Sequence, residues 1–404
     1  MSDVVSFDGF AAKNLVRSFD ATFGLAEWRE RFFVRTPGRT EVAGNHTDHQ
    51  GGNVIAASVD RFIRGVCAAN EKPVIRVYSE GFGDVEVRCD ELAARDDERN
   101  TTISLVRGMA AQFADRGYVP QGFDLYVASE VLGGSGLSSS AAFEVELGQA
   151  MNTLWAKGVV SPEDLAIMGK ETERKWFGKP CGLMDQSAVA LGGIQHMSFA
   201  VPDQIEASPI DFDFADAGYA ICLTATGSSH ADLTDEYAAV PAEMNQVAQA
   251  LGAEHLGQLS EDTLLVHLPE LRDACGDRPL MRAIHFFREE RLVARRAKAL
   301  NEKDMDTFLK ATRLSGASSA MYLQNVSVAR LSEQPAMLAL AVSGELLGTA
   351  GASRIHGGGF GGTIQAFVPG NRVESYTEGM DRVFGSGACQ VYQVDHVGSH
   401  AWRL

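Results

Sequence analysis

The chain has 404 residues, of which 45% are hydrophobic, and a formal net charge of −17. It is long enough to bury a large core and to divide into two domains, and its negative charge disfavours nucleic acid or an anionic membrane as a partner. The six cysteines are scattered without a Cys-x-x-Cys pair, which indicates neither a zinc site nor a disulfide framework. The first residues lack a basic and then apolar signal region, and no apolar run reaches about 18 residues. We therefore expect a cytoplasmic protein, and we expect it to be a monomer.

The first informative segment, residues 35–54, crowds hydrogen-bonding side chains between glycines. These side chains include Arg39, Asn45, His46 and Asp48. The run follows neither the period of a helix nor that of a strand, so the sequence predicts a shaped loop. Such a loop suits a small polyol such as a sugar, because each hydroxyl needs a donor or acceptor placed against it. A solvated turn is the alternative that spacing alone leaves open.

A glycine- and serine-rich segment, residues 133–142, separates a predicted strand at 123–128 from a predicted amphipathic helix at 141–155. This order suits phosphate, because glycine lets backbone N–H groups approach an anion and the first helical turn offers unpaired N–H groups. No lysine follows the glycines, so this is not the Gly-x4-Gly-Lys phosphate loop. Leu137 also stands where a nucleophile elbow needs its second glycine. A helix cap of small residues is the alternative.

A third segment contains two acids at predicted helix ends. Ser161 and the Pro-Glu-Asp that follows it predict a helix start, and this helix runs to Phe177 with Glu173 near its end. Gly-Lys-Pro stops the helix, and a new short helix near Gly182 has Asp185 in its first turn. An aspartate there offsets the helix dipole or meets a ligand.

A late glycine cluster, residues 357–362, formally satisfies Gly-x-Gly-x-x-Gly. A strand pattern at 363–368 follows it, whereas the dinucleotide motif needs a helix there, so we reject that interpretation. The cluster allows close approach of the backbone to a ligand or another loop, or forms a tight turn. His356 abuts it, and we interpret this residue as structural or as supporting the site from behind.

The remaining patterns predict an α+β protein. Strand-like runs occur at 54–69, 73–79, 84–88 and 219–224, and residues 281–313 look helical. Strands and helices do not alternate regularly, which disfavours a doubly wound sheet. We predict domains at 1–205 and 206–404, with a boundary near the prolines around residue 205.

Taken together, the four segments resemble the GHMP small-molecule kinases, and within them the galactokinase family, over nearly the whole chain. Residues 35–54 are similar to the galactokinase signature, 133–142 to the phosphate motif, 181–186 to the stretch with the catalytic aspartate, and 357–362 to the third motif. The resemblance implies a two-domain α+β fold with the active site in the interdomain cleft. It also implies ATP- and Mg²⁺-dependent phosphorylation of the C1 hydroxyl of galactose to galactose 1-phosphate.

The resemblance assigns roles residue by residue. Asp185 would be the catalytic aspartate, with Arg39 as its cationic neighbour. The sugar would be lined by Asn45, His46, Asp48, Gly182 and Tyr237. The nucleotide would be held by Gly134, Ser135, Gly136, Leu137, Ser138, Ser139 and Ser140, with Ser79 near the adenine. Magnesium would be held by Ser139 and Glu173.

Three departures leave the sugar specificity open. The chain has Asn45 where the family usually has Glu, His49 where it has Tyr, and Glu41 where it has Asn. The alternatives are a GHMP kinase of a related sugar, such as galacturonate or an N-acetylhexosamine, and a non-catalytic galactose sensor. The intact serine run and Asp185 favour catalysis over sensing.

Overall fold

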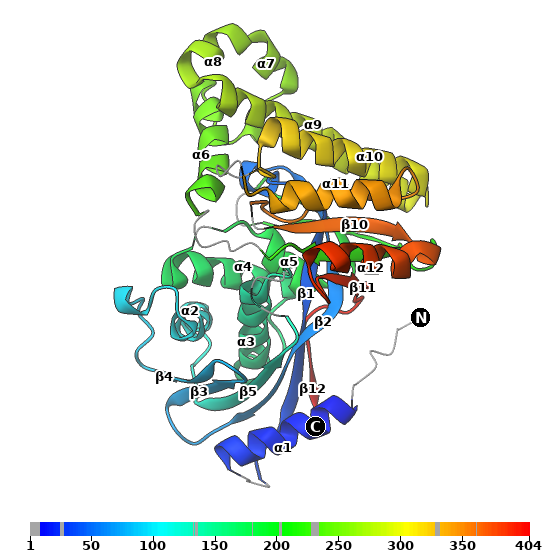
Figure 1. The fold of residues 1–404 in the computed structure, drawn as a ribbon. Helices are drawn as coiled ribbons and strands as arrows, with labels where there is room; N and C mark the ends of the chain where they lie inside the picture. Colours follow the sequence, from blue (N-terminus) through cyan, green and yellow to red (C-terminus); the bar gives the residue numbers. More distant parts are fainter. Residues whose placement is uncertain are drawn as a thin grey trace.

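The computed structural model describes residues 9–24, 28–131, 133, 136–179, 181–201, 204–227, 234–327, 332–360 and 362–404. In these residues the strands form two sheets (Figure 1). The larger sheet has the order β12-β1-β2-β5-β3-β4, and β6 pairs with β2 and β7. All its pairs are antiparallel except β3 with β5. Its strands are β1 Phe32–Ala43, β2 Asn53–Ala69, β3 Val74–Ser79, β4 Gly83–Arg88, β5 Phe123–Ser129, β6 Ile194–Ser198, β7 Glu206–Ile210 and β12 His400–Arg403.

The smaller sheet is antiparallel and has the order β11-β8-β10-β9. Its strands are β8 Tyr219–Ala225, β9 Ala352–Ile355, β10 Thr363–Pro369 and β11 Cys389–Tyr392. Alternate residues of β10 face two helix layers. Ile364 and Ala366 share a core with α11 and α12, while Phe367 packs on Phe308 of α10 with ring centroids 4.8 Å apart. Burial on both faces explains the apolar sequence of this strand.

Helices cover both sheets (Figure 1). Those of the first half are α1 Gly9–Phe23, α2 Thr102–Asp115, α3 Ser139–Trp155, α4 Pro162–Thr172 and α5 Met184–Leu191. Those of the second half are α6 Thr234–Ala250, α7 Glu261–Val266, α8 Leu268–Cys275, α9 Asp277–Asn301, α10 Met305–Ser318, α11 Pro335–Leu347 and α12 Val373–Phe384. Short helical turns are η1 Asp48–Gln50, η2 Asp96–Glu98, η3 Glu173–Phe177, η4 Leu256–Gln258, η5 Ser319–Leu323 and η6 Gly370–Arg372. The α+β prediction is confirmed.

One prediction of local structure was wrong. Residues 35–43, expected to belong to a loop, lie in β1 and pair with β2. The apolar alternation is missing because this strand is buried along most of its length and its polar side chains find partners inside the protein. Arg39 pairs with Asp185, and Glu41 pairs with Arg354. Partners so distant in sequence cannot be seen in a local pattern.

The other elements around the site agree with the sequence. β5, α3 and β10 lie where strand, helix and strand were predicted, and Ser161 caps α4 by accepting from the N–H of Asp164. The helical stretch predicted at 281–313 is two helices, since α9 ends at Asn301 and α10 begins at Met305. The boundary near residue 205 stays a prediction, and β12 returns the end of the chain to the first sheet. None of the helices described is long and apolar enough to cross a membrane.

Candidate active site

The centre of the site is an ion pair between Arg39 of β1 and Asp185 of α5. Arg39 Nε donates to Asp185 Oδ1 over 2.6 Å and Nη2 donates to Oδ2 over 2.9 Å, so the guanidinium fork meets the carboxylate with two bonds. The remaining nitrogen, Nη1, donates to the carbonyl of Gly136 over 2.5 Å. The Ser138 hydroxyl donates to Asp185 Oδ2 as well. One arginine therefore joins the predicted catalytic aspartate to the glycine loop before α3.

This pairing keeps Asp185 ionised. Burial acts to raise the pKa of Asp185, but the charge and hydrogen bonds of Arg39 outweigh it, and the pKa lies below its ordinary value. Asp185 is in the first turn of α5, where the helix N-terminus also favours a negative charge. Its side chain is 33% exposed, whereas that of Arg39 is 8% exposed. The site thus presents a fixed carboxylate with one accessible edge.

That edge faces a cavity of about 60 Å³ lined by both halves of the chain. The lining residues are Arg39, Glu41, His46, Asp48, His49, Lys179, Cys181, Gly182, Met184, Asp185, Tyr237, Gly357 and Gly358. They come from β1, the loop and η1 that follow it, the loop before α5, the start of α5, α6 and the loop after β9, so segments far apart in the sequence meet at this cavity. A larger cavity of about 730 Å³ beside β12 and α3 contains none of these residues, so size does not identify the site.

His46, Asp48, Gly182 and Tyr237, four of the predicted sugar-binding residues, line this cavity. A β-carbon on Gly182 would collide with the Asp48 carboxylate, so a larger residue there would force the Asp48 side chain to move. His46 Nε2 lies 2.8 Å from the carbonyl of Gly358, and its ring centroid is 5.3 Å from that of Tyr237. Burial lowers the pKa of His46 to about 3, so its imidazole is neutral and Nε2 donates to this carbonyl.

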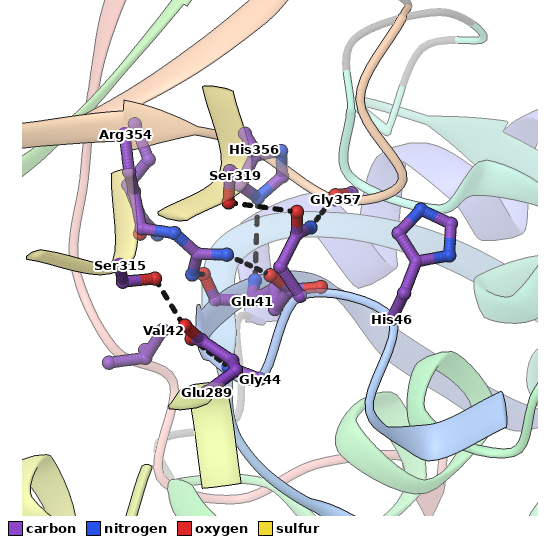
Figure 2. A network of polar contacts seen from close by, with 12 residues as sticks. Glu41, Val42, Gly44, His46, Glu289, Ser315, Ser319, Arg354, His356 and Gly357 are labelled. Atoms are coloured by element: carbon purple, nitrogen blue, oxygen red, sulfur yellow. Dashed lines mark hydrogen bonds and ion pairs between the residues drawn. The ribbon is translucent and has the colours of Figure 1, made fainter. Parts of the chain in front are cut away.

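Asn45 differs from the prediction, because it does not line the cavity. Its side chain is buried, and its Nδ2 donates to the carbonyl of Gly357 over 2.5 Å. Its Oδ1 accepts from Asn325 Nδ2 over 2.7 Å and from the Ser319 hydroxyl over 3.2 Å. Figure 2 shows Ser319 and Gly357 in this network, which joins η5 to the glycine cluster. The Asn45 amide therefore uses both its nitrogen and its oxygen in hydrogen bonds within the protein.

Glu41 is a cavity residue that the sequence did not predict. Arg354 Nη2 donates to Glu41 Oε1 over 2.5 Å (Figure 2), and both side chains are buried. Burial raises the pKa of Glu41 despite this partner. The available signal was its position two residues after Arg39, since alternate residues of a strand share a face. Because the sequence predicted a loop at residues 35–54, this strand periodicity was not applied to Glu41.

On the predicted phosphate side, Gly134 and Ser135 lie outside the described residues. Gly136 has a φ of +82°, a left-handed conformation that favours glycine. Leu137 is buried in the core and its carbonyl accepts the backbone N–H of Arg39 over 3.1 Å. The structure therefore ties this loop to β1 through both the backbone and the side chain of Arg39.

The serines at the start of α3 complete this side. Ser139 and Ser140 form its first residues, where a helix leaves backbone N–H groups for an anion. Ser79 lies at the end of β3 and is 8% exposed. Within the described ranges no hydrogen bond links the Ser79 side chain to this loop, so its approach to the adenine stays a prediction.

Glu173, the predicted metal ligand, is buried beside α3. Its Oε1 accepts from the Ser140 hydroxyl and from Lys179 Nζ, each over 3.0 Å, and its Oε2 accepts from Gln186 Nε2 over 3.1 Å. The hydroxyl in contact with Glu173 is therefore that of Ser140, whereas the sequence favoured Ser139. Adjacent residues on a helix point about 100° apart, which the sequence could not resolve at a helix start.

Comparison with known proteins connects this geometry to a family. The model of the galactokinase galactose-binding signature matches residues 17–69, and that of the GHMP kinase N-terminal domain matches residues 104–193. Residues 104–193 therefore match a GHMP kinase N-terminal domain, and the chain carries the galactokinase galactose-binding signature. Galactokinases of Lactobacillus helveticus and Streptomyces coelicolor are each 29% identical to it, over 381 and 360 residues. These alignments cover 92% and 89% of the chain and 94% and 90% of the two relatives.

Solved structures agree with these matches. The galactokinase of Lactococcus lactis complexed with galactose superposes with a TM-score of 0.82 at 25% identity, covering 98% of this chain and all of that one. The mevalonate kinase of Methanococcus jannaschii superposes with a TM-score of 0.61 at 13% identity and shows the shared fold alone. Together these matches support an ATP-dependent sugar kinase, as the resemblance in sequence implied.

Proposed function

We propose that this protein is a galactokinase that transfers the terminal phosphoryl group of ATP to the C1 hydroxyl of galactose. The products are galactose 1-phosphate and ADP. The observation that carries the proposal is the Asp185 carboxylate, held by Arg39 at the point where the sugar-side cavity meets the glycine loop.

In this reaction Asp185 accepts a hydrogen bond from the attacking hydroxyl and takes its proton as the bond to phosphorus forms. Arg39 fixes the orientation of the carboxylate and keeps it ionised. Phosphoryl transfer depends mainly on positioning and on charge stabilisation, so a rigid, paired carboxylate suits the task. The Gly136 carbonyl on the same guanidinium fixes this pair relative to the nucleotide loop.

The loop and the start of α3 bind the phosphates. Backbone N–H groups at Ser139 and Ser140 and the positive end of the helix supply donors that need no reorganisation. This local site has to overcome the repulsion of a chain with a net charge of −17.

We include Mg²⁺ in the proposal because side chains of this site are suitable ligands for it. Among the residues described, no three His, Cys, Asp or Glu side chains form a metal cluster. Mg²⁺ needs only one or two carboxylates beside water and phosphate oxygens, and Glu173 with Ser140 provides a carboxylate and a hydroxyl. These residues would hold the ion, which when bound neutralises charge on the phosphates.

The sugar side favours a neutral sugar. Of the three carboxyl groups around the cavity, Glu41 is paired with Arg354 and Asp185 with Arg39, so repulsion of a carboxylate at C6 would come mainly from Asp48. Asn45, which stands where the family usually has Glu, does not line the cavity, because its amide is bonded to Gly357 and Asn325. The cavity is also small, so a hexose enters it only when lining side chains move apart.

The test is ADP release, coupled to an indicator enzyme, with ATP, Mg²⁺ and a panel of galactose, galacturonate and N-acetylgalactosamine. We expect galactose to give the highest kcat/KM by at least about tenfold, a difference of about 1.4 kcal/mol in transition-state binding. Activity on another sugar alone would support a sugar kinase but would contradict the assignment as a galactokinase. Galactose binding by calorimetry without ADP release on any sugar would indicate a sensor.

A further inference from the structure

The residue that the function leaves unexplained is His356. It follows β9 directly, is 5% exposed, and lies between β1 and the glycine loop. Its Nε2 accepts the backbone N–H of Glu41 over 3.3 Å (Figure 2). The Thr40 hydroxyl lies 3.0 Å from the same nitrogen and itself accepts from Gln365 Nε2, so its own proton is directed to Nε2.

These contacts determine where the imidazole carries its proton. Burial, with Arg39 and Arg354 nearby, lowers the pKa of His356 well below its ordinary value, so the ring is neutral. A neutral imidazole has one N–H, and a nitrogen that accepts a backbone N–H cannot carry it. The proton is therefore on Nδ1.

Nδ1 faces the glycine loop. A β-carbon placed on Gly136 would lie 3.0 Å from Nδ1 of His356, so the ring edge is in contact with the residue whose carbonyl receives Arg39. Within the described part of the chain, Nδ1 donates to no acceptor: both hydrogen bonds of the ring use Nε2. An N–H that the protein leaves without an acceptor can donate to a ligand bound in the loop.

We propose that the Nδ1–H of His356 donates to a phosphate oxygen of the bound nucleotide beside Gly136. This inference rests on the proposed function, since it needs a nucleotide in the loop. Arg39 spends three of its five N–H donors on Asp185 and the Gly136 carbonyl, so a donor from His356 would add to whatever the arginine can give a phosphate. His356 therefore belongs to the nucleotide site although it lies in the second half of the chain.

Two variants separate this role from structural support of β1. In His356→Gln the longer side chain can place its carbonyl oxygen near Nε2 and keep the bond from Glu41 N–H, but no donor remains at Nδ1. In His356→Asn the shorter side chain can place an amide N–H near Nδ1, but it no longer reaches Glu41. Each variant thus removes one of the two hydrogen-bonding ends.

The measurements are calorimetric binding of a non-hydrolysable ATP analogue without sugar, KM for ATP, KM for galactose and the melting temperature. We expect H356Q to weaken analogue binding and raise KM for ATP about tenfold while KM for galactose stays within about twofold. We expect H356N to lower the melting temperature but to bind the analogue at least about threefold more tightly than H356Q. Parental analogue binding in H356Q, or equal weakening in both variants, overturns the proposal.

Analogue binding is measured without a sugar, so it is independent of which sugar is phosphorylated. If the parent binds the analogue but phosphorylates no sugar, the galactokinase assignment fails while the comparison of the two His356 variants still decides the role of Nδ1.

Discussion

Two carboxylates of the site are paired with cations in contrasting ways. Asp185 receives two hydrogen bonds from Arg39, whose side chain is 8% exposed. Glu173 receives one from Lys179, whose side chain is 53% exposed. An arginine fork is preorganised, whereas lysine is a point charge on a flexible stem. We infer that Arg39 stays paired with Asp185 when substrates bind, whereas Lys179 can be displaced from Glu173 by another cation.

The largest effect should follow from removing the fixed carboxylate. Asp185→Asn keeps the shape of the side chain but can neither accept the hydroxyl proton nor form the ion pair, so kcat should fall by about 10²-fold or more. Calorimetry should show galactose binding changed by less than about threefold. Near-normal turnover in a folded variant would remove Asp185 from the mechanism.

The next largest effect should follow from breaking the two-bond contact between the Arg39 guanidinium and Asp185. Arg39→Lys retains the charge but loses the two-bond geometry and the contact with Gly136, so kcat should fall about tenfold, the scale of one charged hydrogen bond. The matched control is Lys179→Arg, in which a flexible and exposed partner is exchanged and kcat should change less than about threefold. Equal losses in both variants would contradict the contrast drawn here.

The glycine loop and the helices around it could be predicted from local sequence, because glycine, proline and cap residues act within a few positions. The strand character of residues 35–43 could not, because Arg39 and Glu41 are neutralised by Asp185 and Arg354. Hydrophobic periodicity has no means of recording such pairs.

The direction in which a side chain points is the second feature that could not be predicted from the sequence. Asn45 and His46 are neighbours, yet His46 lines the cavity and Asn45 bridges Gly357 and Asn325. Motif order was enough to predict four residues that line the cavity, but whether a given side chain faces it depends on backbone geometry, such as the φ of +61° at His46.

Magnesium titrations test whether Mg²⁺ can replace Lys179 as the cation paired with Glu173. Glu173→Gln removes the charged oxygen and should raise the half-saturating Mg²⁺ concentration several-fold, about threefold or more, at fixed ATP. Lys179→Met removes the competing ammonium and should lower it by about twofold to threefold. An unchanged titration in both variants would leave Glu173 and Lys179 as a structural ion pair.

A smaller effect concerns pH. In the parent, burial raises and Arg39 lowers the pKa of Asp185, with Arg39 prevailing, so Asp185 is ionised throughout the neutral range. Arg39→Met leaves burial unopposed by that charge, and the pKa rises. The acid limb of kcat/KM should move to higher pH by about one unit or more, while Arg39→Lys leaves it nearer to the parental position. An acid limb that is identical in all three proteins would show that Arg39 does not control the ionisation of Asp185.

The position of the phosphate on the product tests the central claim most directly, because Asp185 can activate only the hydroxyl it touches. Phosphorus and carbon NMR of a reaction with ATP, Mg²⁺ and ¹³C-labelled galactose should show one phosphate on C1, equal in amount to the ADP formed. Asp185→Asn should form at most about one hundredth of this product over the same time. Phosphate on another carbon, or ADP released without a sugar phosphate, would contradict the account.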